Sequence, residues 1–360
     1  MSEDADGSPA VADASDIRPL RILQVASPWV PVPPEQYGGS EWIAHWLCEG
    51  LRERGHDVTL VATGDSSTNV PVVSAFDERP PGMGEDVAPE LVQTLEARDA
   101  IERIRPDVVH DHAFTSPAAA PGDVPYVVTA HSAGHRPFDE YYTRLSERVA
   151  LVAISDAQRR HLPEARWAAT IPNAIDVASF PFDEVGGDDF VFLGRMVEEK
   201  GPHVAAEAAR RSGASLLIAG RVEVAEEESY FDERVQPLLD ERIRFVGEAD
   251  ADQKRELLAG ARALLFPIDW DEPFGLVVVE ALACGTPVIG FRRGAVPELI
   301  EDGTTGFVVD DVDGMVAAMG DVGRLSRAAC RRSVEDRFDI GRMVRQYDAL
   351  YRRVVRPIAA

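Results

Sequence analysis

The sequence predicts an α/β protein of two Rossmann-like, doubly wound parallel-sheet domains that face each other across a cleft. Short apolar runs alternate with helical or loop-like segments, which is typical of parallel strands covered by helices on both faces. This alternation begins twice along the chain. The length of 360 residues also exceeds the size at which one hydrophobic core usually keeps growing.

The first series of apolar runs begins at Leu20. The run LRILQVAS, an amphipathic stretch at residues 40–54 and the run DVTLVATG form one strand–helix–strand unit. The runs VVSAF, DVVHDH, YVVTAHS and ALVAIS follow. We therefore predict an N-terminal domain at residues 19–178, after a disordered acidic tail at residues 1–18.

The second series follows a stretch rich in Pro, Gly and Asp. It comprises DFVFLG, SLLIAG, IRFVGE, ALLFP, PVIGF and GFVVD, and predicts a C-terminal domain at residues 186–338. The last helical stretch, at residues 339–358, is a candidate to pack back on the N-terminal domain. Ligands of open α/β sheets bind beyond the carboxyl ends of the strands, so we expect the site between the two domains.

The composition excludes several classes of function. A formal net charge of -25 argues against docking on nucleic acid or anionic lipid, which clustered Lys and Arg side chains hold. The three cysteines lie far apart, which indicates neither a disulfide framework nor a zinc site and fits a reducing cytoplasm. No apolar stretch reaches the roughly 18 residues that span a bilayer. The sequence predicts a cytoplasmic protein and leaves its oligomeric state open.

Lysine is rare in this chain, where only Lys200 and Lys254 occur. Together with the acidic excess, this composition favours a salt-loaded cytoplasm and a halophilic archaeon as the source. An acidic mesophilic protein from an arginine-using genome is the alternative. Under either interpretation, each retained lysine needs a reason.

Two basic residues follow the strand DFVFLG, which ends at Gly194. Arg195 comes directly after this strand, and Lys200 precedes a helical segment. A strand-to-helix turn points backbone N–H groups and the positive helix end at an anion, to which Arg and Lys add full charges. We predict a diphosphate site here. The alternative is a solvated basic pair beside Glu198 and Glu199.

Two carboxylates stand at E-x7-E spacing in DWDEPFGLVVVEALACGTPVIG. Glu272 opens a loop ahead of a helix, and Glu280 lies within that otherwise apolar helix. An ionised carboxylate there is costly unless it is paired or faces a polar ligand. We interpret Glu280 as ligand-facing, and the pair as able to bind vicinal hydroxyls of a ribose and a sugar. The alternative is a loop-capping Glu280 and an exposed first-turn Glu272.

Glycines and histidines mark further candidate positions. Gly38 and Gly39, in QYGGSEW, precede a helix, where glycine allows close backbone approach and the helix N-terminus favours anions. His110 and His112 flank Asp111 at a strand end. Metal binding there is conceivable, but we favour strand-end polarity.

With these motifs the chain resembles family 4 of the retaining glycosyltransferases, the glycosyl transferases group 1 with the GT-B fold. The resemblance covers nearly all of residues 20–355 and is strongest from Glu272 through Glu298. It implies transfer of a hexose from a nucleotide-diphosphate sugar, with UDP-glucose as the first guess and GDP-mannose next, to an unknown hydroxyl acceptor. It also implies that Glu272 approaches the donor sugar and Glu280 the ribose.

The resemblance extends to other positions of the site. It implies that Arg195 and Lys200 hold the donor diphosphate, and that His131 stands near the reactive face of the donor sugar. It also implies that the loop of Gly38 and Gly39 closes on the donor phosphates. The remaining donor-binding candidates are Gly194, Phe274, Gly275, Leu276 and Asn173.

The resemblance predicts no catalytic metal and no other cofactor, because related enzymes neutralise the leaving diphosphate with Arg, Lys and helix ends. Asp269-Trp270-Asp271 spells D-x-D, the metal signature of a different glycosyltransferase fold, and we interpret it as chance because it directly precedes EPFG. The alternatives are a GT-B nucleotide-sugar epimerase, an inverting transferase, and a noncatalytic sugar-nucleotide-binding subunit.

Overall fold

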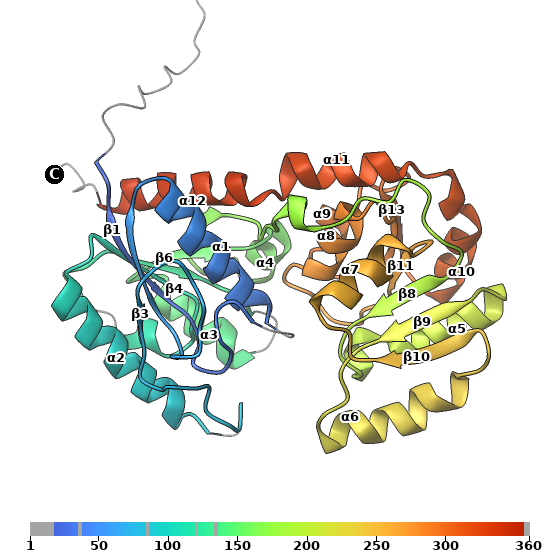
Figure 1. Ribbon diagram of the computed structural model, residues 1–360, viewed down its shortest axis with the longest axis horizontal. Helices are drawn as coiled ribbons and strands as arrows, with labels where there is room; N and C mark the ends of the chain where they lie inside the picture. Colours follow the sequence, from blue (N-terminus) through green and yellow to red (C-terminus); the bar gives the residue numbers. More distant parts are fainter. Residues whose placement is uncertain (1–17, 35–37, 84–85, 120, 133–135, 356–360) are drawn as a thin grey trace, which may run out of the picture.

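Two parallel sheets form the cores of the computed structural model, which describes residues 18–34, 38–83, 86–119, 121–132 and 136–355 (Figure 1). The first sheet has the strand order β3-β2-β1-β4-β5-β6-β7, and the second has the order β10-β9-β8-β11-β12-β13. Each half of the chain therefore starts near the middle of its sheet and winds outwards in both directions. These two doubly wound sheets confirm the predicted fold class.

The N-terminal half carries the first sheet, whose strand pairs are all parallel. Every residue of its strands β4 and β5 is buried, as expected for strands covered on both faces. The edge strand β7 has no counterpart among the predicted runs, because its sequence WAAT is weakly apolar and none of its residues is buried. The elements are β1 (Arg21–Val25), α1 (Gly39–Glu53), β2 (Asp57–Val61), β3 (Val72–Val73), α2 (Ala88–Ile104), β4 (Val108–Asp111), β5 (Tyr126–Thr129), α3 (Arg136–Leu145), β6 (Ala150–Ala153), α4 (Asp156–His161) and β7 (Trp167–Thr170).

The C-terminal half carries the second sheet, and its apolar helix α8 (Leu276–Ala283) contacts α11 (Arg327–Arg337) and α7 (Ala251–Ala259). Its elements are β8 (Phe190–Leu193), α5 (Pro202–Ser212), β9 (Leu216–Ala219), α6 (Ala225–Tyr230), β10 (Ile243–Gly247), α7 (Ala251–Ala259), β11 (Leu264–Phe266), α8 (Leu276–Ala283), β12 (Val288–Phe291), α9 (Val296–Leu299), β13 (Gly306–Val309), α10 (Val312–Asp321), α11 (Arg327–Arg337) and α12 (Ile340–Val355). No helix in the described ranges is both long enough and apolar enough to cross a membrane.

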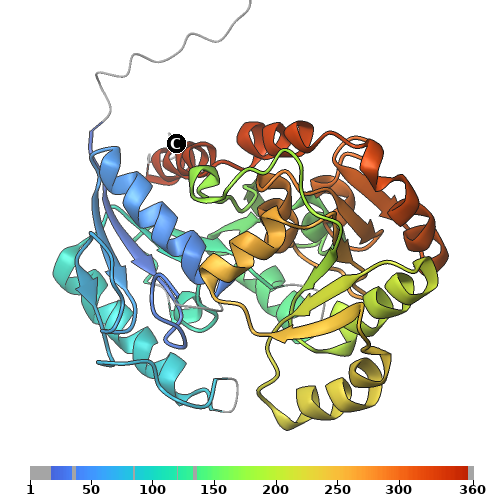
Figure 2. The same ribbon diagram turned by 45° about the vertical axis from the view of Figure 1, so that its right-hand side comes forward.

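The last helix returns to the N-terminal half. Both ribbon views show α11 on the C-terminal half and α12 crossing to the other half (Figures 1 and 2). At the crossing, Ile175 donates its backbone N–H to Phe338, and Ile340 donates to Ile175. Helix α12 packs on α1, where Gly50 admits Val344 so closely that an added Cβ would lie 2.5 Å from its Cγ2. The apolar face of α12 thereby joins the N-terminal core.

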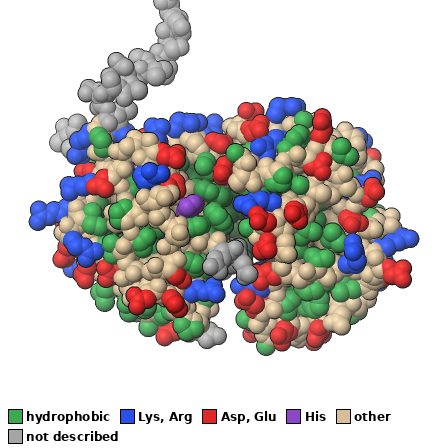
Figure 3. Space-filling view, in the orientation of Figure 1, with side chains coloured by type: hydrophobic (Ala, Val, Ile, Leu, Met, Phe, Trp, Pro, Cys, Tyr) green, Lys and Arg blue, Asp and Glu red, His purple; other side chains and the backbone are tan. Residues whose placement is uncertain are grey.

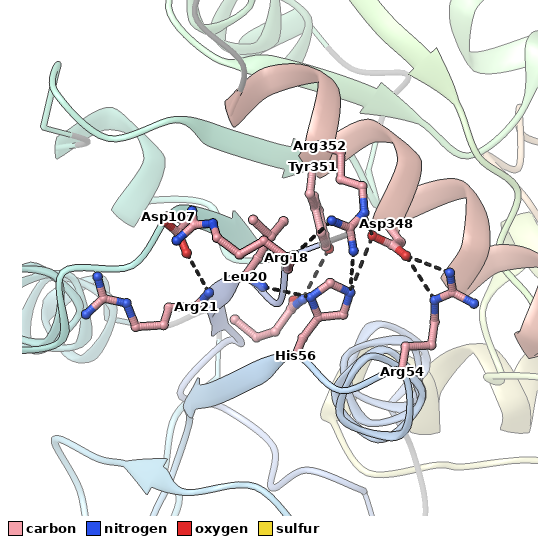
Figure 4. A network of polar contacts seen from close by, with 10 residues as sticks. Arg18, Leu20, Arg21, Arg54, His56, Asp107, Asp348, Tyr351 and Arg352 are labelled. Atoms are coloured by element: carbon pink, nitrogen blue, oxygen red, sulfur yellow. Dashed lines mark hydrogen bonds and ion pairs between the residues drawn. The ribbon is translucent and has the colours of Figure 1, made fainter. Parts of the chain in front are cut away.

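A buried carboxylate reinforces this docking (Figure 4). Asp348 of α12 is 3% exposed and pairs with Arg54 at 2.7 Å, Arg352 at 2.7 Å and His56 at 3.3 Å. Burial by itself would raise the pKa of Asp348, but hydrogen bonds from His56 and Arg54 and the charge of Arg352 lower it to about 2. The backbone carbonyl of Arg18 accepts from Arg352, so the start of the described chain joins the same network.

We predict that Asp348→Asn destabilises the protein by about 2 kcal/mol at neutral pH. The pKa of Asp348 is about 2 in the folded protein and near its ordinary value in the unfolded chain, so folding stabilises the ionised carboxylate. This contribution is complete above about pH 4, the ordinary Asp pKa, and fades as the pH falls towards 2. Urea unfolding of both proteins from pH 7 down to pH 3 measures the difference. Asp313→Asn, which breaks an exposed pair with Arg211, is the control and should cost less than about 0.5 kcal/mol. Equal effects of the two substitutions would contradict a special role for Asp348.

Candidate functional site

Two helix N-termini meet between the halves. Helix α1 follows Gly38 at φ 151°, and α8 follows Gly275 at φ 102°, backbone conformations that favour glycine. Neither start has a side-chain cap. A Cβ added to Gly39 would lie 3.1 Å from Cδ1 of Leu276, so the two helix starts touch. Their first-turn N–H groups and positive ends are available to an anion.

Lys200 lies beside Glu272 near these helix starts. The lysine ends a short 3₁₀ turn (Glu198–Lys200) after β8, and its Nζ is 2.5 Å from Oε2 of Glu272. Trp270 donates its indole N–H to the same oxygen at 3.1 Å, and Nζ lies 4.9 Å from the ring centroid of Trp270. Gly201, at φ 74°, packs this turn against the end of β11, because a Cβ there would lie 2.4 Å from the Pro267 carbonyl oxygen. Adjacency of β8 and β11 thus joins two residues far apart in sequence.

Glu280 is also paired with a lysine. Its carboxylate is 2.6 Å from Nζ of Lys254 on α7, and the residue is 8% exposed. The buried carboxylate of Glu280 was predicted to need a partner or a ligand, and Lys254 is such a partner. Both lysines of the chain pair with the two E-x7-E carboxylates. Lys254 was not among the predicted site residues, although lysine is rare enough in this chain for its position to be a signal.

Arg195 forms looser contacts at the end of β8. Its guanidinium is 3.6 Å from Glu199 and 3.8 Å from Glu227 of α6, and its side chain is 35% exposed. The preceding Gly194 donates its backbone N–H to Ala219 of the neighbouring strand. Arg195 therefore lies at the carboxyl edge of the second sheet, as predicted, with its charge balanced by Glu199 and Glu227.

A pocket of about 290 Å³ lies between the two halves, beside Glu272. Helix α4 lines one side, and residues 271–273 with Gly294 line the other. Arg160 of α4 pairs with Glu298 of α9 at 2.9 Å, and the Asp156 N–H donates to the same carboxylate. Figure 3 shows a groove between the halves with basic and acidic side chains along its C-terminal rim. A larger hollow of about 490 Å³ along α7 contains none of the predicted site residues.

His131 follows β5 and is the partly exposed end of a histidine cluster. Its Nε2 lies 2.8 Å from Nδ1 of His112. Burial lowers the pKa of His131 to about 4, so its ring is neutral at pH 7. Burial, followed by the neighbouring rings, also holds the pKa of His112 well below its usual value.

Strand alternation separates the polar residues at the end of β4. Successive side chains of a strand point to opposite faces of the sheet. His110 therefore bonds to Thr129 and His112 to Gln24 on one face, whereas Asp111 accepts from Ser116 and Tyr126 on the other. Burial raises the pKa of Asp111 to about 7, although these hydrogen bonds oppose the shift. Among the residues that the structure describes, no three His, Cys, Asp or Glu side chains gather as metal ligands.

The other predicted positions divide between site and core. Phe274 is 3% exposed and packs edge-on against Phe338, so its side chain supports α8 from within the core. Asn173 is buried close to the crossing at Ile175. In the D-x-D stretch, Asp269 pairs with Arg293 and Asp271 accepts from the Gly294 N–H. The two carboxylates thus have separate partners, and the interpretation of the motif as chance stays a prediction.

Comparison with known families matches both halves of the chain. Residues 37–179 match the description Glycosyltransferase Family 4, and residues 182–320 match Glycosyl transferases group 1. The chain is 29% identical over 374 residues to glycogen synthase of Mycobacterium tuberculosis, covering 87% of this chain and 88% of that protein. It is 30% identical over 317 residues to phosphatidyl-myo-inositol mannosyltransferase of Mycolicibacterium smegmatis, covering 78% and 80%.

A solved structure shares the architecture. AviGT4, a glycosyltransferase involved in avilamycin A biosynthesis, matches with a TM-score of 0.74 and 26% identity over 94% of this chain and 98% of that chain. Sequence similarity along both halves agrees with this match of the whole two-sheet arrangement. The chain belongs to glycosyltransferase family 4, the group 1 enzymes of GT-B fold, and is a hexosyltransferase that takes its sugar from a nucleotide sugar.

Proposed function

We propose that this enzyme transfers a hexose from a nucleoside diphosphate sugar to a hydroxyl acceptor with retention of anomeric configuration. The observation that carries the proposal is the meeting of the uncapped starts of α1 and α8 close to Lys200 and Glu272. Backbone N–H groups, two positive helix ends and an ammonium together favour a diphosphate. In this proposal, residues 19–178 form the acceptor domain and residues 186–338 the donor domain.

The ion pairs suit the roles proposed for their members. An ammonium has three N–H donors, so Lys200 can bond Glu272 and a phosphate oxygen together. Within the described ranges, the ion pairs of Arg195 are long, at 3.6 and 3.8 Å, so its guanidinium can turn to the diphosphate at small cost. We propose that Glu272 accepts from donor-sugar hydroxyls and Glu280 from the ribose. Gly38, Gly39 and residues 274–276 supply backbone around the donor.

The proposed reaction breaks the bond between the anomeric carbon and the diphosphate oxygen while the acceptor oxygen bonds to that carbon on the same face. The departing phosphate oxygen takes the acceptor proton, so no separate side-chain base is required. Arg195, Lys200 and the helix ends stabilise the charge that develops on the leaving group. Because these groups supply the positive charge, we propose that no metal takes part.

Relatives support the choice of donor. One relative is named glycogen synthase and another phosphatidyl-myo-inositol mannosyltransferase, which supports glucose and mannose as candidate sugars. We propose UDP-glucose as the first donor to test and GDP-mannose as the second. The acidic, lysine-poor composition favours assay in molar KCl, as in a halophilic cytoplasm. Product NMR separates retention from inversion and from epimerisation of the donor.

We predict that a nucleotide-sugar donor raises the melting temperature in molar KCl, because a ligand that binds only the folded state stabilises it. At a concentration 100 times its Kd, the gain is about 2.7 kcal/mol. A thermal-shift panel of UDP-glucose, GDP-mannose and UDP-N-acetylglucosamine measures this, with glucose and mannose as controls. No stabilisation by any nucleotide sugar would contradict the proposal.

Arg195→Ala and Lys200→Ala should each lower kcat by roughly two to three powers of ten, by analogy with the loss of one oxyanion donor. Steady-state kinetics with the donor identified by the panel measures the effect. Arg234→Ala is the matched control, because that exposed arginine pairs with Glu198 in the same half, and it should stay near the native rate. Near-native turnover of both active-site variants would refute the assignment.

Two variants test whether Glu280 binds the ribose or only pairs with Lys254. Lys254→Met alone should lower the melting temperature, because it leaves a carboxylate buried without its cation. The double variant Lys254→Met with Glu280→Gln should recover stability but still bind the nucleoside diphosphate at least tenfold more weakly, since a charge-assisted hydrogen bond to ribose is lost. Calorimetry and thermal melts measure the two effects. Recovery of both stability and affinity would mean that Glu280 has only its structural partner.

A further inference from the structure

A continuous series of hydrogen bonds leads from His131 into the interior of the N-terminal half. Nε2 of His131 meets Nδ1 of His112 at 2.8 Å, and Nε2 of His112 meets Oε1 of Gln24 at 3.2 Å. The Nε2 amide of Gln24 then donates to the hydroxyl of Tyr351 at 3.2 Å. Three adjacent strands, β5, β4 and β1, thus link His131 to α12.

The series continues beyond Tyr351. The Tyr351 hydroxyl is 2.6 Å from Nδ1 of His110, whose Nε2 is 2.8 Å from Oγ1 of Thr129. Thr129 in turn meets the hydroxyl of Tyr347, one turn earlier on α12, at 2.7 Å. We name the seven residues from His131 to Tyr347 the histidine relay.

One member sets the direction of donation through the whole relay. The Gln24 amide nitrogen faces Tyr351 and its oxygen faces His112. His112 must therefore carry its proton on Nε2 to donate to that oxygen. Its ring is neutral, because burial and the neighbouring rings lower its pKa, so Nδ1 is bare and accepts. His131 must then donate from Nε2, which leaves its own Nδ1 without a proton.

The orientation of the Gln24 amide also fixes the donors and acceptors from Tyr351 to Tyr347. The Tyr351 hydroxyl accepts from Gln24 and donates to Nδ1 of His110. The proton of His110 is then on Nε2 and donates to Thr129, whose hydroxyl donates to Tyr347. Every buried polar group between the ends has a partner under this one assignment, which is the condition for burying such a network at low cost.

His131 is the member of the relay that reaches solvent. The other six residues are at most 5% exposed, whereas His131 is only partly buried. Its Nδ1 has no hydrogen-bond partner among the residues that the structure describes. The relay therefore leaves Nδ1 unprotonated on His131, the only one of the seven residues that a ligand can reach.

We propose that Gln24 and Tyr351 are positioning residues that hold His131 with its proton on Nε2, so that bare Nδ1 accepts a hydrogen bond from a donor-sugar hydroxyl. The role towards the sugar rests on the proposed function; the tautomer does not. The C-terminal helix thereby controls a group at the reaction centre through buried hydrogen bonds.

Nitrogen-15 NMR of histidine-labelled protein tests the tautomer at pH 7, with the His131 signals identified by comparison with His131→Gln. The expected spectrum shows a neutral ring protonated on Nε2. Tyr351→Phe removes the hydroxyl that orients the Gln24 amide, so the amide can turn and His131 should populate both tautomers. Gln24→Leu, which removes the acceptor of His112, should do the same.

Tyr347→Phe is the matched control, because it makes the same substitution one helical turn away in an equally buried residue. It removes only the last acceptor of the relay and should leave the His131 spectrum unchanged. In turnover, Tyr351→Phe should lower kcat about fivefold to tenfold, the effect of one lost hydrogen bond, with little change in acceptor KM. Tyr347→Phe should stay within about twofold.

The outcomes separate the tautomer from the proposed function. A wild-type His131 protonated on Nδ1, or identical spectra for the two tyrosine variants, would overturn the relay even if glycosyl transfer is observed. Absence of nucleotide-sugar binding would instead remove the proposed function and leave the spectra as evidence for the relay. A changed spectrum with native kcat would refute the role of Nδ1 towards the sugar.

Discussion

The docking of α12 on the N-terminal half is the interaction on which the rest of the structure depends. The helix continues from α11 of the C-terminal half, yet its apolar face lies in the N-terminal core. Asp348 adds a buried charge network at the same contact. The chain is therefore joined to the N-terminal half by α12 as well as at Ile175, and the pocket beside Glu272 lies between the two halves.

The positive groups beside the groove contrast with the strongly negative net charge of the protein. A chain with a net charge of -25 repels a diphosphate at long range, so local positive groups must reverse the field. In the proposed function, Lys200, Arg195 and the two uncapped helix starts supply these positive groups. Each side-chain cation is held by a carboxylate, and this pairing keeps the groups oriented without neutralising the helix ends.

The buried polar groups follow a different rule from those at the rim. His110, His112 and Gln24 are almost inaccessible, and desolvation keeps the histidines neutral. Neutral rings in a fully connected series avoid the cost of buried charge, and they transmit a preferred proton position between elements. Asp348 remains ionised in a similar degree of burial because two arginines and a histidine surround it. Burial thus has opposite consequences depending on the partners that surround each group.

The sequence by itself determined the fold class, because alternation of apolar runs with helical segments is a local pattern that specifies parallel strands covered on both faces. It also identified Glu280 as a carboxylate that needs a partner or a ligand, and the two glycines at the start of α1. Only the tertiary structure decided that the partner is Lys254, that Phe274 points into the core, and that His131 is joined to Tyr351. These pairings depend on strand order and on which helix covers which face, and contacts between residues so distant in sequence leave no periodic signal in the chain.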